Sequence, residues 1–262
     1  MSYHKPLILV TNDDGINAPG IRKLIEIMRT IGKVVVVAPD KSQSGMGHAI
    51  TVTSPLRVTK LVEEDDYLEY ACSGTPVDSV KLGMKVIMGR KPDLLVSGIN
   101  HGSNASVNVL YSGTMAAVLE AAIENIPAIG FSLNDYSLKA NFDGFEDHII
   151  AIVKQVLENA LPHGICLNVN IPALNGSPLK GIKVVRQGVG YWDEAYDERT
   201  DPLNRNYYWI TGVFRNNDDD LDTDLWALKN NYIAVVPVQV DLTSHDAIHL
   251  LKKWNFSNGS KK

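Results

Sequence analysis

The sequence has little cysteine, no long apolar run and no excess of positive charge. Cys72 and Cys166 are the only two cysteines among 262 residues and match no pairing pattern, so a disulfide framework is excluded and a reducing compartment is expected. No stretch approaches the roughly 18 apolar residues of a membrane span. The formal net charge is −5 and basic residues form only short pairs, which argues against a nucleic-acid polymer as partner.

Several common catalytic signatures are also missing. The chain has no Walker A sequence, no Gly-x-Gly-x-x-Gly after a strand and no Gly-x-Ser-x-Gly elbow, so it lacks the usual signals of an NTPase, a dinucleotide-binding enzyme or a serine hydrolase. The first expected strand begins at Leu7 and leaves no room for a secretory signal. With the cysteine content, this predicts a cytoplasmic protein.

The first half of the chain alternates short apolar strands with amphipathic helices. Strands are expected at 7–11, 34–37, 93–97 and 128–131, and helices at 18–31, 76–88 and 114–125. This alternation predicts an α/β fold, a doubly wound and mostly parallel sheet with helices on both faces. The more polar segments 49–53, 56–62 and 67–72 are expected to be short strands forming a hairpin beside the main sheet.

The second half is less regular. A helix at 145–160 and strands at 166–171 and 182–186 precede a stretch rich in aromatic residues, which include Tyr191, Trp192, Tyr207, Tyr208 and Trp209. Clustered aromatics in a polar stretch indicate an excursion that packs on another subunit or caps the chain's own sheet, and both alternatives stay open here.

The rest of the second half completes the predicted organisation. The acidic segment 216–224 is expected to be a solvated loop, with Thr223 as N-cap of a helix at 224–229. No linker divides the chain, so residues 1–262 are expected to form one domain. Its core would be about 1–180 and 232–240, with a β-hairpin excursion at about 185–225 and a C-terminal helix at 243–254, both used in oligomerisation.

Polar residues gather where the predicted parallel strands end. Asp13 and Asp14 follow the first strand, the segment 38–48 follows the second, and the segment 98–104 follows the strand at 93–97 and leads to a helix start at 112–114. The carboxyl ends of parallel strands lie at one edge of the sheet, so these loops should converge on one crevice.

The donors that would meet there are mainly oxygens. Asp13, Asp14, Asn100 and the hydroxyl of Ser44 or Ser42 favour Mg²⁺ or Mn²⁺, with Ca²⁺ as an alternative, over zinc. Ser112-Gly113-Thr114 would offer hydroxyls and backbone N–H groups to an anion. The competing structural interpretation is an Asx turn in which the aspartates cap the helix starting near Ala18.

Two histidines, His48 and His101, flank the expected crevice and could donate a proton to a leaving group, although loop histidines are common. The segment Ser73-Gly74-Thr75-Pro76 is interpreted as ordinary helix capping by Thr75, with Asp78 three residues later. His245 and His249, four residues apart on the expected C-terminal helix, are interpreted as a solvated helix face.

Several segments, in the same order and at the same spacing, resemble the SurE family of stationary-phase survival proteins, which are metal-dependent nucleotidases. They are Ile8–Ile16, Val37–His48, Ser73–Asp78, Val96–Asn104 and Tyr111–Thr114, with a looser likeness at 191–210, Thr223-Asp224 and 232–239. One departure is Tyr232–Pro237, where the family more often has a serine and a threonine.

The resemblance implies a Rossmann-like αβα core, a single divalent cation per subunit and a C-terminal region that reaches a partner subunit in a homodimer or homotetramer. It implies that Asp13, Asp14, Ser44 and Asn100 hold the cation, with Asp13 and Asp14 also catalytic. The phosphate and substrate contacts expected from the same loops are Asn12, Gly45, Asn104, Ser112, Gly113 and Thr114.

The predicted function is therefore hydrolysis of nucleoside monophosphates at the 5′ position, with 3′-nucleotidase and exopolyphosphatase activity as extensions. The alternative is a metal- or nucleotide-binding module without turnover. A receiver domain would need its acceptor aspartate after the third strand, whereas Asp40 ends the second. A haloacid-dehalogenase phosphatase needs Asp-x-Asp, and the residue two after Asp13 is Gly15.

Overall fold

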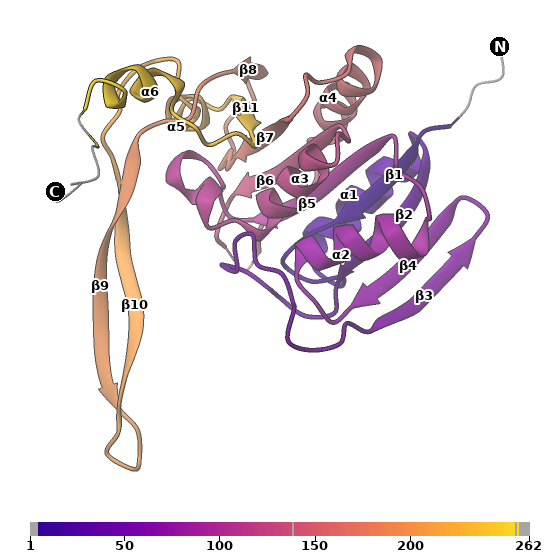
Figure 1. The fold of residues 1–262 in the computed structure, drawn as a ribbon, viewed down its shortest axis with the longest axis horizontal. Coiled ribbons are helices and arrows are strands. Elements are labelled where there is room, and N and C mark those ends of the chain that lie inside the picture. The colour runs from indigo at the N-terminus through magenta and orange to yellow at the C-terminus, as the bar shows by residue number, and fades with distance from the viewer. Residues whose placement is uncertain (1–4, 138, 255, 257–262) are drawn as a thin grey trace, which may run out of the picture.

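The computed structural model of the chain describes residues 5–137, 139–254 and 256. Its centre is a nine-stranded sheet in the order β3-β4-β2-β1-β5-β6-β7-β11-β8 (Figure 1). The six consecutive strands from β4 to β7 run parallel. They are β1 (Leu7–Thr11), β2 (Lys33–Pro39), β4 (Tyr67–Cys72), β5 (Leu94–His101), β6 (Ala128–Asn134) and β7 (Ile165–Pro172). The predicted α/β class with a mostly parallel sheet is confirmed.

Helices cover both faces of this sheet because its central strands are apolar on both sides. One buried cluster joins the sheet to α1 (Pro19–Arg29) and α4 (Glu146–Asn159). A second joins the opposite face to α2 (Pro76–Leu82) and α3 (Gly113–Ile123). The predicted helix at 76–88 continues past α2 as a π-helical turn at Gly83–Ile87. Among the described residues, no helix has the length and apolarity needed to cross a membrane.

Strand β1 is the topological switch point of the sheet, because β2 pairs with it on one side and β5 on the other. The register pairs Thr11 of β1 with Ser97 of β5. The loops that follow these two strands therefore begin side by side, at the position where open α/β sheets form their ligand crevice.

The predicted hairpin beside the sheet is wrong in two respects. Strand β3 (Val58–Glu64) pairs with β4, but β4 pairs in turn with β2, so the hairpin is the edge of the main sheet. The segment 49–53 forms no strand. Its polar groups are satisfied by the start of α2, because Thr51 donates through N–H and hydroxyl to the Asp78 carboxylate and Ala49 accepts from Thr75.

The far edge of the sheet is mixed. Strand β11 (Ile233–Gln239) is antiparallel to β7 and parallel to the short β8 (Ile182–Val184). Helix α5 (Asp224–Lys229) packs on this edge, and Thr223 caps it by accepting from the N–H of Trp226, as predicted. The C-terminal helix α6 (His245–Leu251) is shorter than expected, and the ring nitrogen of His245 lies 2.8 Å from the carboxylate of Asp241.

The aromatic stretch forms a regular hairpin of two 11-residue strands, β9 (Gly190–Thr200) and β10 (Asn206–Asn216), so the predicted β-hairpin in the excursion is confirmed. It extends away from the sheet as a long two-stranded arm (Figure 1). Tyr207, Tyr208 and Trp209 are 41%, 57% and 59% exposed in the single chain. The alternative in which these aromatics cap their own sheet is therefore wrong.

Candidate functional site at the carboxyl edge of the sheet

The acid pair lies in a tight turn directly after β1. Gly15 adopts φ +99°, a conformation that favours glycine, and the Asn12 side chain donates to its carbonyl at 2.9 Å. The backbone N–H of Gln43 donates to the Asp13 carbonyl at 2.7 Å and joins this turn to the loop after β2. Helix α1 begins at N-cap Ala18 with no side-chain cap, so the aspartates do not serve as its cap.

Asp13 is buried against the start of α3. Its Oδ1 accepts a hydrogen bond of 2.6 Å from the Thr114 hydroxyl, which lies 3.5 Å from Oδ1 of Asn100. The Asn100 amide nitrogen donates to the Gly102 carbonyl, and this fixes which way its oxygen points. A Cβ atom at Gly113 would lie 2.7 Å from the Cβ of Asp13, so glycine is needed for this approach.

Asp14 faces the loops after β2 and β5. Its Oδ2 accepts from the backbone N–H of His101 at 2.9 Å, and its Oδ1 lies 3.5 Å from the Ser44 hydroxyl. The hydroxyl oxygens of Ser42 and Ser44 are 2.9 Å apart. Hydrogen bonds thus connect Asp13 with Asn100 through Thr114, and Asp14 with Ser44 and Ser42, and the two consecutive aspartates bring these two groups of oxygens side by side.

The electrostatics of this group favour a bound cation. Burial, and then the neighbouring Asp14 charge, raise the pKa of Asp13 to about 6, and burial also raises the pKa of Asp14. Across the described ranges, no lysine or arginine forms an ion pair with either carboxylate. Two uncompensated carboxylates beside an amide oxygen and a hydroxyl are the donors that a hard divalent cation prefers, so these residues fit such an ion.

The residues expected to contact phosphate or substrate lie around this group in different ways. Ser112 is the N-cap of α3 and accepts from the N–H of Met115, while Thr114 contacts Asp13. Gly45 is exposed and has φ +77°. Asn12 is fully buried, and within the described part of the chain its Oδ1 has no hydrogen-bond partner.

The two candidate proton donors are each held by another group. His48 Nε2 lies 3.1 Å from the carboxylate of Glu120 on α3, a contact that lowers the pKa of Glu120. His101 reaches Asp14 through its backbone N–H, whereas its ring nitrogen lies 2.8 Å from the Ser137 carbonyl. Neither ring contacts Asp13 or Asp14 in these bonds, and the role of both histidines stays a prediction.

A chain of buried amides supports the loop after β5, and sequence reasoning did not find it. Asn104 donates to the Ser132 hydroxyl, and its backbone N–H and carbonyl contact the side chains of Asn170 and Asn168. The two asparagines on β7 also contact each other at 2.8 Å. Asparagines alternating within an apolar strand were the available signal, because a buried amide requires a partner.

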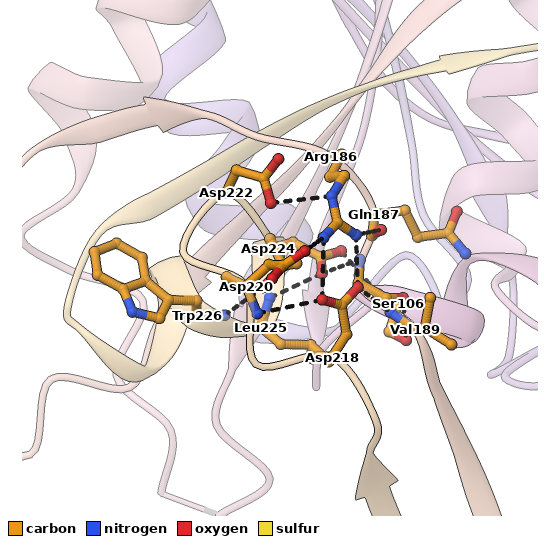
Figure 2. A network of polar contacts seen from close by, with 12 residues as sticks. Ser106, Arg186, Gln187, Val189, Asp218, Asp220, Asp222, Asp224, Leu225 and Trp226 are labelled. Carbon is orange, nitrogen blue, oxygen red and sulfur yellow. Dashed lines mark hydrogen bonds and ion pairs between the residues drawn. The ribbon is translucent and has the colours of Figure 1, made fainter.

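Asp224 is the second support that sequence reasoning missed. Its buried carboxylate accepts from the backbone N–H groups of Ser106, Gly188 and Leu225, each at 2.8 Å (Figure 2). The Ser106 hydroxyl donates to the Gly188 carbonyl. One carboxylate therefore joins the loop after β5 to the root of the β9–β10 hairpin.

The acidic loop before Asp224 is organised rather than simply solvated. Arg186 forms ion pairs with Asp218, Asp220 and Asp222, and the Asp218 side chain is only 8% exposed (Figure 2). These ion pairs hold the loop between β10 and α5 against Arg186, next to the contacts of Asp224.

The fold and this site together define an α/β protein with an acidic, oxygen-rich site at the switch point of a parallel sheet. A family model described as "Survival protein SurE" matches residues 8–194. The chain belongs to the SurE family.

Full-length relatives agree with this assignment. The chain is 56% identical over 260 residues to a protein of Christiangramia forsetii named 5′-nucleotidase SurE, covering 98% of this chain and 100% of that protein. It is 57% identical over 254 residues to the 5′-nucleotidase SurE of Flavobacterium psychrophilum, covering 97% and 99%. The crystal structure of the SurE protein from Aquifex aeolicus superimposes with a TM-score of 0.81 at 40% identity, covering 94% of this chain and 98% of that one.

Proposed function

We propose that the chain is a phosphomonoester hydrolase acting on nucleoside 5′-monophosphates, and that the oxygen cluster around Asp13 and Asp14 is its active site. The observation that carries this assignment is the convergence of two uncompensated carboxylates, buried Asp13 and half-buried Asp14, with Asn100, Ser44 and Thr114 at the switch point of the sheet. The relatives named 5′-nucleotidase SurE, which match over nearly the whole chain, support the reaction class.

Asp13, Asp14, Ser44 and Asn100 would hold one divalent cation per subunit, Mg²⁺ or Mn²⁺ before Ca²⁺, because all the donors are oxygens. When bound, the cation supplies charge neutralisation and Lewis acidity at the phosphate. Thr114 holds Oδ1 of Asp13, and this leaves Oδ2 for orienting the attacking water. Water then adds to phosphorus, the bond to the nucleoside oxygen breaks, and the nucleoside leaves with a proton.

The start of α3 would hold the phosphate. This helix has 11 residues, and Ser112, Gly113 and Thr114 form its first turn next to Asp13. Backbone N–H groups at a helix N-terminus attract anions, so the phosphate would lie between α3 and the acid pair. We place Asn104 and Gly45 at the margin of the same site.

Phosphate release from adenosine 5′-monophosphate tests the proposal. Asp13→Asn and Asp14→Asn should each remove at least 99% of wild-type turnover at saturating Mg²⁺, because each takes one of only two charged ligands from the site. Asp40→Asn, at an exposed position after β2, is the matched control and should keep wild-type turnover. Wild-type rates in either site variant would contradict the assignment. Substrate binding without phosphate release by the wild type would favour the binding-module alternative.

We further propose a homodimer or homotetramer in which residues 185–215 and the C-terminal helix contact a partner subunit. The support is the projecting hairpin, which leaves Tyr207, Tyr208 and Trp209 exposed in the single chain. We treat residues 1–262 as one functional domain and place it in the cytoplasm, since Cys72 and Cys166 are free, buried thiols.

A further inference from the structure

A cavity of about 280 Å³ lies between the loop after β5 and the root of the β9–β10 hairpin. Three aromatic side chains, two leucines, two asparagines, a lysine and a serine of the loop after β5 line it. Among them are Tyr136, Trp192, Phe214, Ser103, Asn134 and Lys229. The hydrolysis of the phosphate ester uses none of them.

The cavity adjoins the acid pair through the loop after β5. The His101 N–H contacts Asp14 at 2.9 Å, and two residues later the Ser103 N–H donates to the Tyr136 hydroxyl at 3.1 Å. Two residues of backbone span at most about 7 Å. A ribose joins phosphate to base over a comparable distance, so a nucleotide whose phosphate lies at the acid pair can place its base in this cavity.

The aromatic walls are held in place by the protein itself. Trp192 meets Phe214 edge to face at 5.7 Å between ring centroids, and its Nε1 donates to Asn108 at 2.8 Å. Tyr136 packs directly on Gly102, where a Cβ atom would lie 2.7 Å from the ring. Fixed aromatic rings bind the π-face of a base with little loss of conformational freedom.

The polar groups of the cavity match the edge of a base. The Asn134 side chain forms no hydrogen bond within the described ranges, is half-buried, and offers both a donor and an acceptor. Lys229 adds an exposed cation at the rim. Apolar walls with a few polar groups are the usual composition of a small-molecule pocket.

We infer that this cavity is the nucleobase subsite of the enzyme, with Tyr136 as the stacking residue and Asn134 facing the edge of the base. The inference rests on the proposed function, because it presumes that the phosphate lies at the acid pair. It makes the root of the hairpin a part of the substrate site.

This inference is tested by comparing the KM values of two substrates, one with a base and one without. Ribose 5-phosphate carries the same phosphate and sugar as adenosine 5′-monophosphate but has no base. In Tyr136→Ala, the KM for adenosine 5′-monophosphate should rise about tenfold, the usual effect of losing one stacking residue, while the KM for ribose 5-phosphate changes less than twofold. Tyr136→Phe keeps the ring and should keep the wild-type KM for both substrates.

Inhibition of ribose 5-phosphate hydrolysis by adenosine gives a second measurement that needs no phosphate on the ligand. Adenosine should compete in the wild type and lose about tenfold in affinity in Tyr136→Ala. Tyr70→Ala, on strand β4 between β3 and β2, is the matched control and should change neither measurement.

An equal change for both substrates in Tyr136→Ala, or no change for either, would overturn the nucleobase subsite while the proposed hydrolase function stands. A changed oligomeric state with unchanged KM values would assign the cavity to a subunit contact and overturn it as well. If the wild type releases phosphate from neither substrate, the proposed function fails and the subsite fails with it.

Discussion

At the scale of single residues, the site is defined by a carboxylate held where a charge is unfavourable. Asp13 is 3% exposed, adjoins Asp14, and accepts its side-chain hydrogen bond from the neutral hydroxyl of Thr114. The raised pKa of Asp13 means that the folded, metal-free protein binds a proton there more tightly than the unfolded chain does. The residue that makes the site suited to a cation therefore destabilises the protein without one.

The destabilisation of the metal-free protein by ionised Asp13 can be measured from the pH dependence of its unfolding free energy. A pKa raised from 3.8 to about 6 makes the contribution of Asp13 to unfolding free energy largest below pH 3.8 and lost as pH rises through 6. Asp13→Asn removes the titrating group, so in EDTA its unfolding free energy relative to wild type should increase by about 3 kcal/mol between pH 3.5 and pH 7. Urea denaturation at both pH values checks this, and a difference independent of pH would contradict it.

Thr114 provides a second test at the residue scale. Its hydroxyl stabilises the ionised form of Asp13, so Thr114→Val should raise the pKa of Asp13 further and weaken Mg²⁺ binding at pH 7 by about tenfold. Thr114→Ser keeps the hydroxyl and should bind Mg²⁺ as the wild type does. Isothermal titration with Mg²⁺ distinguishes the two variants, and equal affinities in both would show that the hydroxyl is not needed.

At the scale of elements, helix α3 carries a structural cap and an anion site in the same turn. Ser112 accepts from the N–H of Met115, so Ser112→Ala should lower the unfolding free energy by about 1 kcal/mol. It should also weaken product inhibition by inorganic phosphate, because the same turn faces the acid pair. Thr75→Ala removes the corresponding cap of α2 and should lower stability alone. Equal phosphate inhibition in both variants would show that the turn at Ser112 holds no phosphate.

The parallel strands could be predicted from the sequence because a strand that is buried on both faces is a continuous run of apolar residues. β1 and β2 read as continuous apolar runs, and the polar residues that follow them lie where a parallel sheet must place them. Segment 49–53 has residues typical of a strand, but its polar groups form hydrogen bonds with the start of α2 instead of with another strand. These partners lie more than 20 residues away, so the local sequence does not show them. A β-hairpin excursion was expected at about 185–225, but not the bounds of its two strands, because both of its faces are exposed and neither has an apolar pattern.

The candidate cation ligands could also be predicted, because they follow the ends of these strands. The residues that hold their loops in place, such as Asp224, could not. Asp13, Asp14 and Asn100 stand at strand ends, so the topology alone brings them together. Asp224 is 118 residues from Ser106 and looks like an ordinary residue of the first turn of a helix. Its role depends on where the fold places Ser106 and the hairpin root relative to α5, which a local sequence pattern does not contain.

At the scale of the whole molecule, the hairpin is notable for the large apolar side chains that it leaves exposed in the single chain. Tyr196 and Ile210 are 64% and 65% exposed along an arm that projects away from the central sheet (Figure 1). Large aromatic side chains gathered on one projecting element are typical of an interface between subunits. Because the hairpin root lies beside the loop after β5, assembly and catalysis would share the same segment.

Sedimentation equilibrium tests the assembly. The wild type should give about twice the 28.8 kDa chain mass or a higher even multiple, and Trp209→Ser should shift the distribution towards the monomer. Val86→Ser, in the π-helical turn Gly83–Ile87 outside the proposed contact, is the exposed control and should leave the mass unchanged. A fully active monomer at micromolar concentration would contradict the proposed assembly.

The central claim, that an oxygen-ligated divalent cation at Asp13 and Asp14 drives phosphate release, has one most direct measurement. Phosphate release from adenosine 5′-monophosphate is followed after dialysis against EDTA and after adding back Mg²⁺, Mn²⁺ or Zn²⁺. Activity should disappear on chelation and return with Mg²⁺ or Mn²⁺ more fully than with Zn²⁺, because the donors are oxygens. Full activity in dialysed protein with no detectable metal, or recovery with Zn²⁺ alone, would contradict the claim.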